Sequence, residues 1–221
     1  MSHNYRTIEI PVGVATNELI EFILEHPFSD MSLGNLKKYV IQSRENEEKR
    51  TGIPVTKPLP TTAIDLLKEF QSHAPLRFQF STEESNADDH WQEALCIELR
   101  ARNIPYQYFA DYDEHNNDIS LWTPKGSVTY DVDVEGDPIV PYDKIAEIMD
   151  KGITDSMKLQ QLHVLLETTS PYGLPTIDSY SVEKVAEISV IDKILERLDN
   201  GEITQDQAFK EISDYKLKKG A

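Results

Sequence analysis

Between residues 104 and 136 the chain alternates apolar and polar residues in three short stretches. The stretches read IPYQYFADYD, DISLW and SVTYDVDVEG, and the turn-rich tetrapeptides EHNN and TPKG separate them. Alternation with a period of two is typical of strands, and short polar turns join antiparallel neighbours. The sequence therefore predicts a three-stranded antiparallel meander.

Helices are predicted on both sides of this meander. Trp91, Leu95 and Leu99 recur every four residues before it, and PYDKIAEIMD has a helical apolar pattern after it. Nearer the start, YRTIEIPV and LRFQF read as strands, and Asn17 is expected to cap the helix NELIEFILEH. We expect an α+β fold: a three-stranded antiparallel meander flanked by helices, with a helical C-terminal region.

Composition divides the chain into four segments. Residues 1–51 contain the N-terminal strand and helices, and residues 52–60 form a proline-rich stretch that predicts a linker. Residues 61–142 form the acidic α/β sheet segment. Residues 143–221 are predicted to be a region of helical hairpins.

The hairpin prediction rests on a phrase that occurs twice. Residues 143–154 read DKIAEIMDKGIT and residues 192–204 read DKILERLDNGEIT. In each copy an apolar helical stripe ends at a glycine, and a threonine follows that can cap the next helix. We expect Gly152 and Gly201 to end their helices in the left-handed conformation.

Acidic residues occupy the polar side of two predicted strands. Side chains alternate across a strand, so every second residue shares a face. If the two strands adjoin, these carboxylates lie on one face, where like charges opposite each other cost up to about 1 kcal/mol a pair. This pattern predicts a cation, either a metal ion or the lysines and arginines of a partner. The alternative is that the strands are not adjacent or that water screens the charges.

The net charge also favours a cationic partner. The chain has a formal charge of −17, and residues 61–140 contain 16 acidic and 5 basic residues. Such a field repels nucleic acid and anionic membranes and attracts basic protein surfaces. Solubility alone is the other explanation of the excess.

We therefore expect a non-enzymatic acidic binding protein that docks on a basic protein surface, such as that of a nucleic-acid-binding protein. A phage-type inhibitor whose carboxylates imitate nucleic-acid phosphates is one form of this function. Neither direct nucleic-acid binding nor a membrane partner is expected. The predicted partner-binding residues are Phe109, Asp111, Asp113, Asp131, Asp133 and Glu135.

The alternative is a divalent-metal-dependent, nuclease-like hydrolase. Many such nucleases have a helix, three strands and a helix in this order, with carboxylates on neighbouring strands that hold Mg²⁺. Asp118, Asp131 and Asp133 are the candidate ligands here. The stretch DVDVEG lacks the lysine that this chemistry normally uses beside the second carboxylate, and the segment offers phosphates no basic surface.

Other motifs are incomplete, so no cofactor is predicted. The stretch DYDEHNNDISLW begins like a calcium loop but lacks its glycine and its last glutamate. The single Cys96 is expected to be a small buried side chain. No uncharged apolar run approaches the roughly 18 residues of a membrane span, and we expect a cytoplasmic protein.

Overall fold

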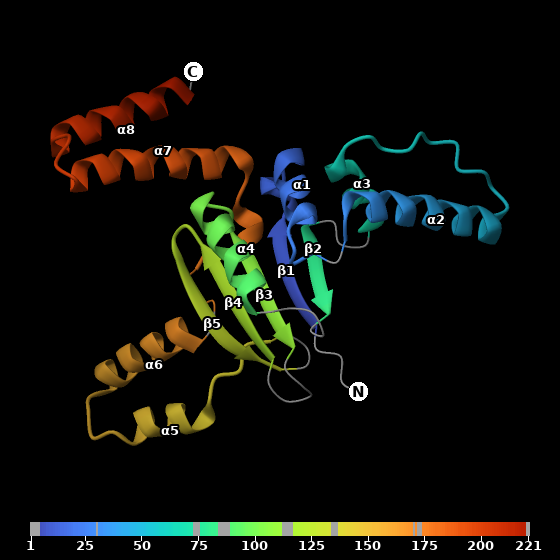
Figure 1. Ribbon diagram of the computed structural model, residues 1–221. Helices are drawn as coiled ribbons and strands as arrows, with labels where there is room; N and C mark the ends of the chain where they lie inside the picture. Colours follow the sequence, from blue (N-terminus) through green and yellow to red (C-terminus); the bar gives the residue numbers. More distant parts are fainter. Residues whose placement is uncertain are drawn as a thin grey trace.

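The computed structural model describes residues 5–29, 31–72, 76–83, 89–111, 117–133, 137–169, 171 and 174–219. The fold is α+β, as predicted, with one antiparallel sheet and helices around it (Figure 1). The strands are β1 (Tyr5–Pro11), β2 (Arg77–Glu83), β3 (Tyr106–Asp111), β4 (Asn117–Thr123) and β5 (Gly126–Val132).

The sheet has five strands in the order β2-β1-β3-β4-β5. The predicted meander is present as β3, β4 and β5, and β1 and β2 add two further strands to the same sheet. β1 pairs with both β2 and β3. Ile8 and Ile10 of β1 are fully buried, and buried backbone groups need hydrogen-bonding partners, which strands on both edges supply. The segments 1–51 and 61–142 therefore share one sheet.

Eight α-helices and two short 3₁₀ helices are assigned within the described residues. They are α1 (Asn17–Glu25), α2 (Leu33–Thr51), α3 (Ala63–Phe70), α4 (Asp89–Ala101), α5 (Tyr142–Asp150), α6 (Asp155–Thr169), α7 (Val182–Asp199), α8 (Gln205–Lys219), η1 (Val12–Val14) and η3 (Ile177–Ser179). The side chain of Thr16, and not Asn17, caps α1, because it accepts a hydrogen bond from the Leu19 amide.

The larger hydrophobic core covers one face of β2, β1 and β3. Ile8 lies between Phe80 and Tyr108 in the strand register, and buried side chains of helices α1 to α4 pack on this face. Cys96 of α4 belongs to this core, as predicted. Further along the same face, Tyr108 is opposite Ser120 of β4, so the face becomes polar towards β5.

A second, smaller core lies on the opposite face of β4 and β5. It consists of Ile119, Leu121, Tyr130, Val132 and Ile177, with Phe109, Val128 and Leu174 packed against them. Because successive side chains of a strand point to opposite faces, each face of the sheet is apolar at one end and polar at the other. The sheet therefore has two polar half-faces.

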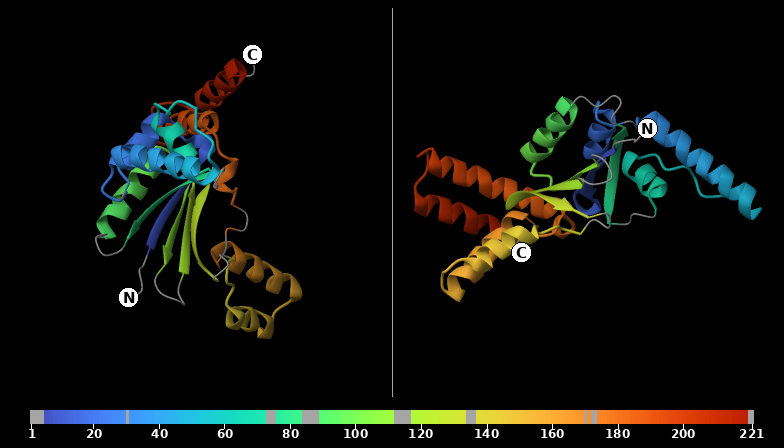
Figure 2. Two further views of the ribbon diagram at one scale, coloured as in Figure 1. Left: turned by 90° about the vertical axis from the view of Figure 1, so that its right-hand side faces the viewer. Right: turned by 90° about the horizontal axis from the view of Figure 1, so that it is seen from below.

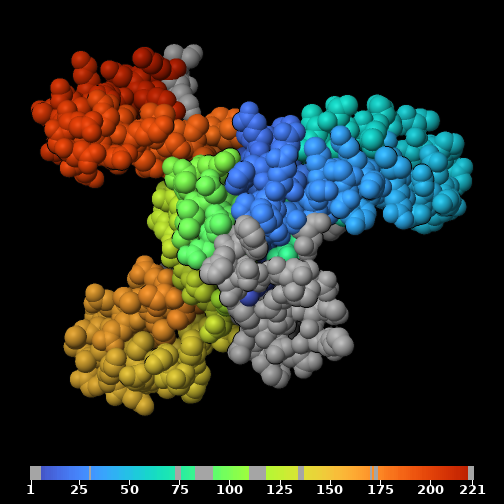
Figure 3. All heavy atoms as spheres, viewed as in Figure 1, coloured from blue at the N-terminus to red at the C-terminus, as the bar shows by residue number. Residues whose placement is uncertain are grey.

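The two C-terminal hairpins extend from the sheet as separate arms. α5 and α6 form one arm, and α7 and α8 form the other (Figures 1 and 2). In the space-filling view the two arms are separate bodies of atoms (Figure 3). α6 has no buried residue, and in the described part of the chain no helix is long and apolar enough to cross a membrane.

The repeated phrase forms two hairpins, as predicted, but with different turns. Gly201 has a φ of 71° and lies in the left-handed region. Gly152 does not have a positive φ, so the prediction of a left-handed Gly152 was wrong. The side chain of Thr204 accepts a hydrogen bond from the Gln207 amide, and the Gln207 side chain accepts one from the Thr204 amide, which is a capping box.

The proline-rich stretch 52–60 contains neither helix nor strand, and it folds back along α2. The Arg44 guanidinium donates hydrogen bonds to the carbonyl oxygens of Lys57 at 2.6 Å and Pro58 at 3.2 Å. The same guanidinium binds Glu69 of α3 at 2.8 Å. Arg44 thereby connects α2, the proline-rich stretch and α3.

Candidate partner-binding face

Two aspartates lie directly opposite each other on the neighbouring strands β4 and β5. Asp118 of β4 pairs in register with Asp131 of β5, and Ala110 of β3 is the neighbour of Asp118 on the other side. Next to this pair, Ser120 and Thr129 are also opposite each other, and their hydroxyl oxygens are 2.8 Å apart. These four side chains make up the polar half-face of β4 and β5, which we call the β4–β5 face.

The electrostatics of this pair are unfavourable. Partial burial raises the pKa of the Asp118 carboxyl group above its ordinary value, and the neighbouring carboxylate of Asp131 raises it further. Asp131 itself is exposed. In the part of the chain that the structure describes, neither carboxylate forms an ion pair with a lysine, arginine or histidine. The β4–β5 face therefore presents negative charge that the described residues do not neutralise.

The expected acidic row assembles only in part. β4 lies between β3 and β5, and the backbone register places Asp111 opposite Asn117, which is opposite Val132. Asp111 is thus in line with Val132 and one position out of step with Asp131. β3 and β5 are not adjacent, so the condition on which their acidic residues would share one face is not met. Asp113 and Glu135 lie outside the described residues.

The remaining predicted residues have other contacts. Phe109 packs against the smaller core, on the opposite side of the sheet from Asp118 and Asp131. Asp133 is bonded to Asp137, because its Oδ1 atom accepts a hydrogen bond from the Asp137 amide at 2.9 Å and its amide donates to the Asp137 carbonyl at 3.0 Å. Partner binding by Phe109 and Asp133 stays a prediction.

The residues of the alternative metal site are Asp118, Asp131 and Asp133. Among the described residues there is no group of three or more histidine, cysteine, aspartate or glutamate side chains placed to hold a metal ion. Asp118 and Asp131 are opposite each other, whereas the Asp133 carboxylate accepts a hydrogen bond from the Asp137 amide. Two carboxylates on a flat face can accept hydrogen bonds from a guanidinium or an ammonium group.

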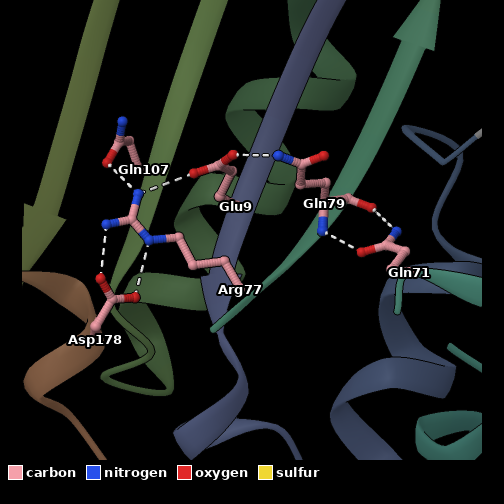
Figure 4. A network of polar contacts seen from close by, with 6 residues as sticks. All are labelled: Glu9, Gln71, Arg77, Gln79, Gln107 and Asp178. Atoms are coloured by element: carbon pink, nitrogen blue, oxygen red, sulfur yellow. Dashed lines mark hydrogen bonds and ion pairs between the residues drawn. The ribbon is translucent and has the colours of Figure 1, made fainter. Parts of the chain in front are cut away.

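Sequence reasoning missed a polar network on the opposite face. Figure 4 shows Arg77 of β2 at its centre, with Glu9, Gln79 and Gln107 on the sheet and Asp178 on η3. The guanidinium donates to both oxygens of Asp178, at 2.9 and 2.7 Å, and to Glu9 and Gln107 at 3.1 and 3.2 Å.

The central contact of this network joins η3 to the sheet. The hydrogen bond to Asp178 is the main cause that raises the pKa of Arg77 above its ordinary value. Arg77 and Asp178 are 101 positions apart, so no local pattern in the sequence could have paired them. Because the cation of Arg77 is already bound to carboxylates, this network is a structural connection and not an open charged site.

No protein-family model, curated protein or solved structure matches the chain in sequence or fold comparisons.

Proposed function

We propose that the protein is a non-enzymatic binding protein whose β4–β5 face docks on a basic protein surface. The observation that carries the proposal is the register of Asp118 and Asp131, two carboxylates held side by side without a cation from the described residues. Like charges opposite each other weaken a sheet, and a threonine or lysine at either position would remove that cost. A partner that places a lysine or arginine beside the two carboxylates offsets this cost.

A protein cation fits this face better than a metal ion does. Mg²⁺ sites on one or two carboxylates are completed by water or substrate phosphates, whereas a guanidinium pairs directly with one or two carboxylates through a few hydrogen bonds. Among the described residues, no third histidine, cysteine, aspartate or glutamate side chain joins Asp118 and Asp131 in a group that could hold a metal ion. The adjacent hydroxyl groups of Ser120 and Thr129 add further hydrogen-bonding atoms to the face.

Charge also directs the choice of partner. The overall charge of −17 draws basic proteins towards the molecule and increases the rate of encounter. A nucleic-acid-binding cleft is rich in lysine and arginine because it neutralises phosphates. The specific form of the proposal is therefore an inhibitor, of the kind found in phages, that occupies such a cleft in place of nucleic acid.

The test compares three baits in affinity capture from the native host's lysate. The wild type and two double variants, Asp118→Asn with Asp131→Asn and Glu45→Gln with Glu196→Gln, are immobilised at equal density. Glu45 and Glu196 are exposed on α2 and α7, so the second variant loses the same charge away from the β4–β5 face. We expect wild type and control to capture the same basic protein, and the Asp118/Asp131 variant to lose it.

Two outcomes contradict the proposal. Equal capture by all three baits means that the β4–β5 face is not the interface, and equal losses in both variants mean that only net charge matters. A melting temperature that rises with millimolar Mn²⁺ in the wild type, and not in the Asp118/Asp131 variant, would instead favour the metal-dependent hydrolase.

A further inference from the structure

β2 is the end strand of the sheet within the described residues, and the side chain of Gln71 closes its outer edge. The Gln71 Nε2 atom donates a hydrogen bond to the Gln79 carbonyl oxygen at 2.6 Å. The Gln79 amide in turn donates to Gln71 Oε1 at 2.8 Å (Figure 4). Gln71 is 8% exposed, so its carboxamide is held in place within the structure.

A carboxamide offers the same donor and acceptor as a peptide group. In an antiparallel ladder the backbone groups of every second residue point away from the paired strand. Those of Gln79 point away from β1 and bind Gln71 in the way that they would bind the peptide group of an added strand. The same alternation directs the backbone groups of Ser81 outwards.

A groove of about 330 Å³, lined by both apolar and polar side chains, lies beside this edge. Its lining includes both glutamines, together with Ser29, Met31, Tyr39, Phe70, Phe80 and Ser81. The rings of Tyr39 and Phe70 stack with their centroids 5.8 Å apart, and Tyr39 is 47% exposed. An extended chain that pairs with β2 alternates its side chains, so one of them would enter this groove.

We infer that the β2 edge is an acceptor site for an extended, apolar peptide segment of a partner protein, and that Gln71 holds it closed. The segment replaces the two hydrogen bonds of Gln71 with its own peptide group and places an aliphatic or aromatic side chain between Met31, Tyr39 and Phe70. Gln71 then acts as a competitive gate, because the site can open only when its carboxamide leaves the edge.

The test removes the Gln71 carboxamide and adds an uncharged peptide that can form a β-strand. The variant Gln71→Ala loses the carboxamide, and Gln160→Ala is the matched control, because Gln160 is exposed on α6. The probe is a short acetylated and amidated peptide of alternating threonine and valine, and a second peptide has proline at its centre. Calorimetry measures the affinity, and hydrogen exchange of the Gln79 amide shows where the peptide binds.

We expect Gln71→Ala to bind the probe about tenfold more tightly than the wild type, because two competing hydrogen bonds are gone. The Gln79 amide should exchange faster in the free variant and become protected again in the complex. The proline peptide should not bind, since it cannot complete the ladder. If Gln71→Ala does not fold, Gln71→Met keeps the length of the side chain without the two hydrogen bonds and leaves no polar group of its own unpaired, and it should behave alike.

Three results would overturn the inference. They are equal affinity of variant and wild type, equal binding of the proline peptide, and dimerisation of Gln71→Ala through β2 without the probe. The probe carries no charge, so the Asp118/Asp131 variant should bind it as the wild type does. Failure of this inference is therefore distinguishable from failure of the proposed function.

Discussion

At the scale of a single residue, the carboxyl group of Asp118 connects the sheet register to stability. Its pKa is raised in the folded state by partial burial and by Asp131. The folded protein therefore holds a proton on Asp118 at a pH where the unfolded chain has released it. Ionisation of Asp118 opposes folding. The stability that the protonated Asp118 contributes is therefore present below the pKa of the unfolded chain and is lost as the pH rises through the higher pKa of the folded protein.

The substitution Asp118→Asn should therefore increase the free energy of unfolding at pH 7, by up to about 1 kcal/mol. The increase should shrink below about pH 4, where the wild-type carboxyl group is itself protonated. Urea denaturation at several pH values measures both effects. Glu45→Gln, at an exposed position of α2, serves as the control and should change the free energy of unfolding little. Destabilisation by Asp118→Asn at pH 7 would show that its carboxylate is paired in the native protein.

At the scale of an element, the two hairpins show how one residue changes a turn. After α7, the Glu202 amide donates to the Arg197 carbonyl and the Gly201 amide donates to that of Leu198, which is the Schellman arrangement. The first copy has no residue between its glycine and isoleucine, whereas the second has Glu202. After α5, Lys151 is extended and the Ile153 amide donates to its carbonyl, so Gly152 is not needed in the left-handed region.

The two glycines should therefore respond differently to the same change. Gly201→Ala should destabilise the protein by about 1 kcal/mol, because a Cβ atom strains the left-handed conformation. Gly152→Ala should be neutral or slightly stabilising, since its added Cβ has no atom within 4 Å. Equilibrium denaturation of both variants measures the difference. Equal losses at the two sites would contradict the distinction between the turns.

Elements of this fold could be predicted where the signal is local. Alternation indicated the meander, helical spacing placed Leu95 and Leu99 in the core, and the capping of α8 followed from Thr204 and Gln207. The position of β1 between β2 and β3 is a long-range pairing, and such pairings leave no periodic trace in the sequence.

The sequence predicted which residues belong to the candidate site but not how the strands place them relative to one another. Asp131 was identified from its strand, but its neighbour is set by the register of β4, which no pattern within β3 or β5 contains. β4 lies between β3 and β5, so Asp111 and Asp131 are not on adjacent strands. The sequence analysis grouped Asp118 and Asp131 as candidate ligands on neighbouring strands, and the structure supplied the register that places them opposite each other.

At the scale of the whole molecule, charge and packing are unevenly distributed. Residues 61–140 supply most of the acidic excess, and this segment contains four of the five strands. The two hairpin arms bury few side chains, so the sheet and helices α1 to α4 form the main core. Repulsion among the carboxylates therefore acts on the part of the molecule that is responsible for its stability.

Added salt should stabilise the protein as a consequence. We expect the melting temperature to rise between low salt and about 0.5 M NaCl, because screening weakens the repulsion. The rise should be smaller in the Asp118/Asp131 double variant than in the wild type. Thermal unfolding followed by circular dichroism measures both proteins. A melting temperature that falls with salt would mean that attractive ion pairs dominate.

The most direct test of the uncompensated β4–β5 face is the pKa of Asp118, measured by NMR titration of its carboxyl carbon. The wild type and Asp131→Asn should be titrated in parallel. The structure predicts a wild-type pKa above the ordinary value of about 3.9, and a lower value in Asp131→Asn that burial keeps somewhat raised. A wild-type pKa below the ordinary value, or one that Asp131→Asn leaves unchanged, would contradict the account.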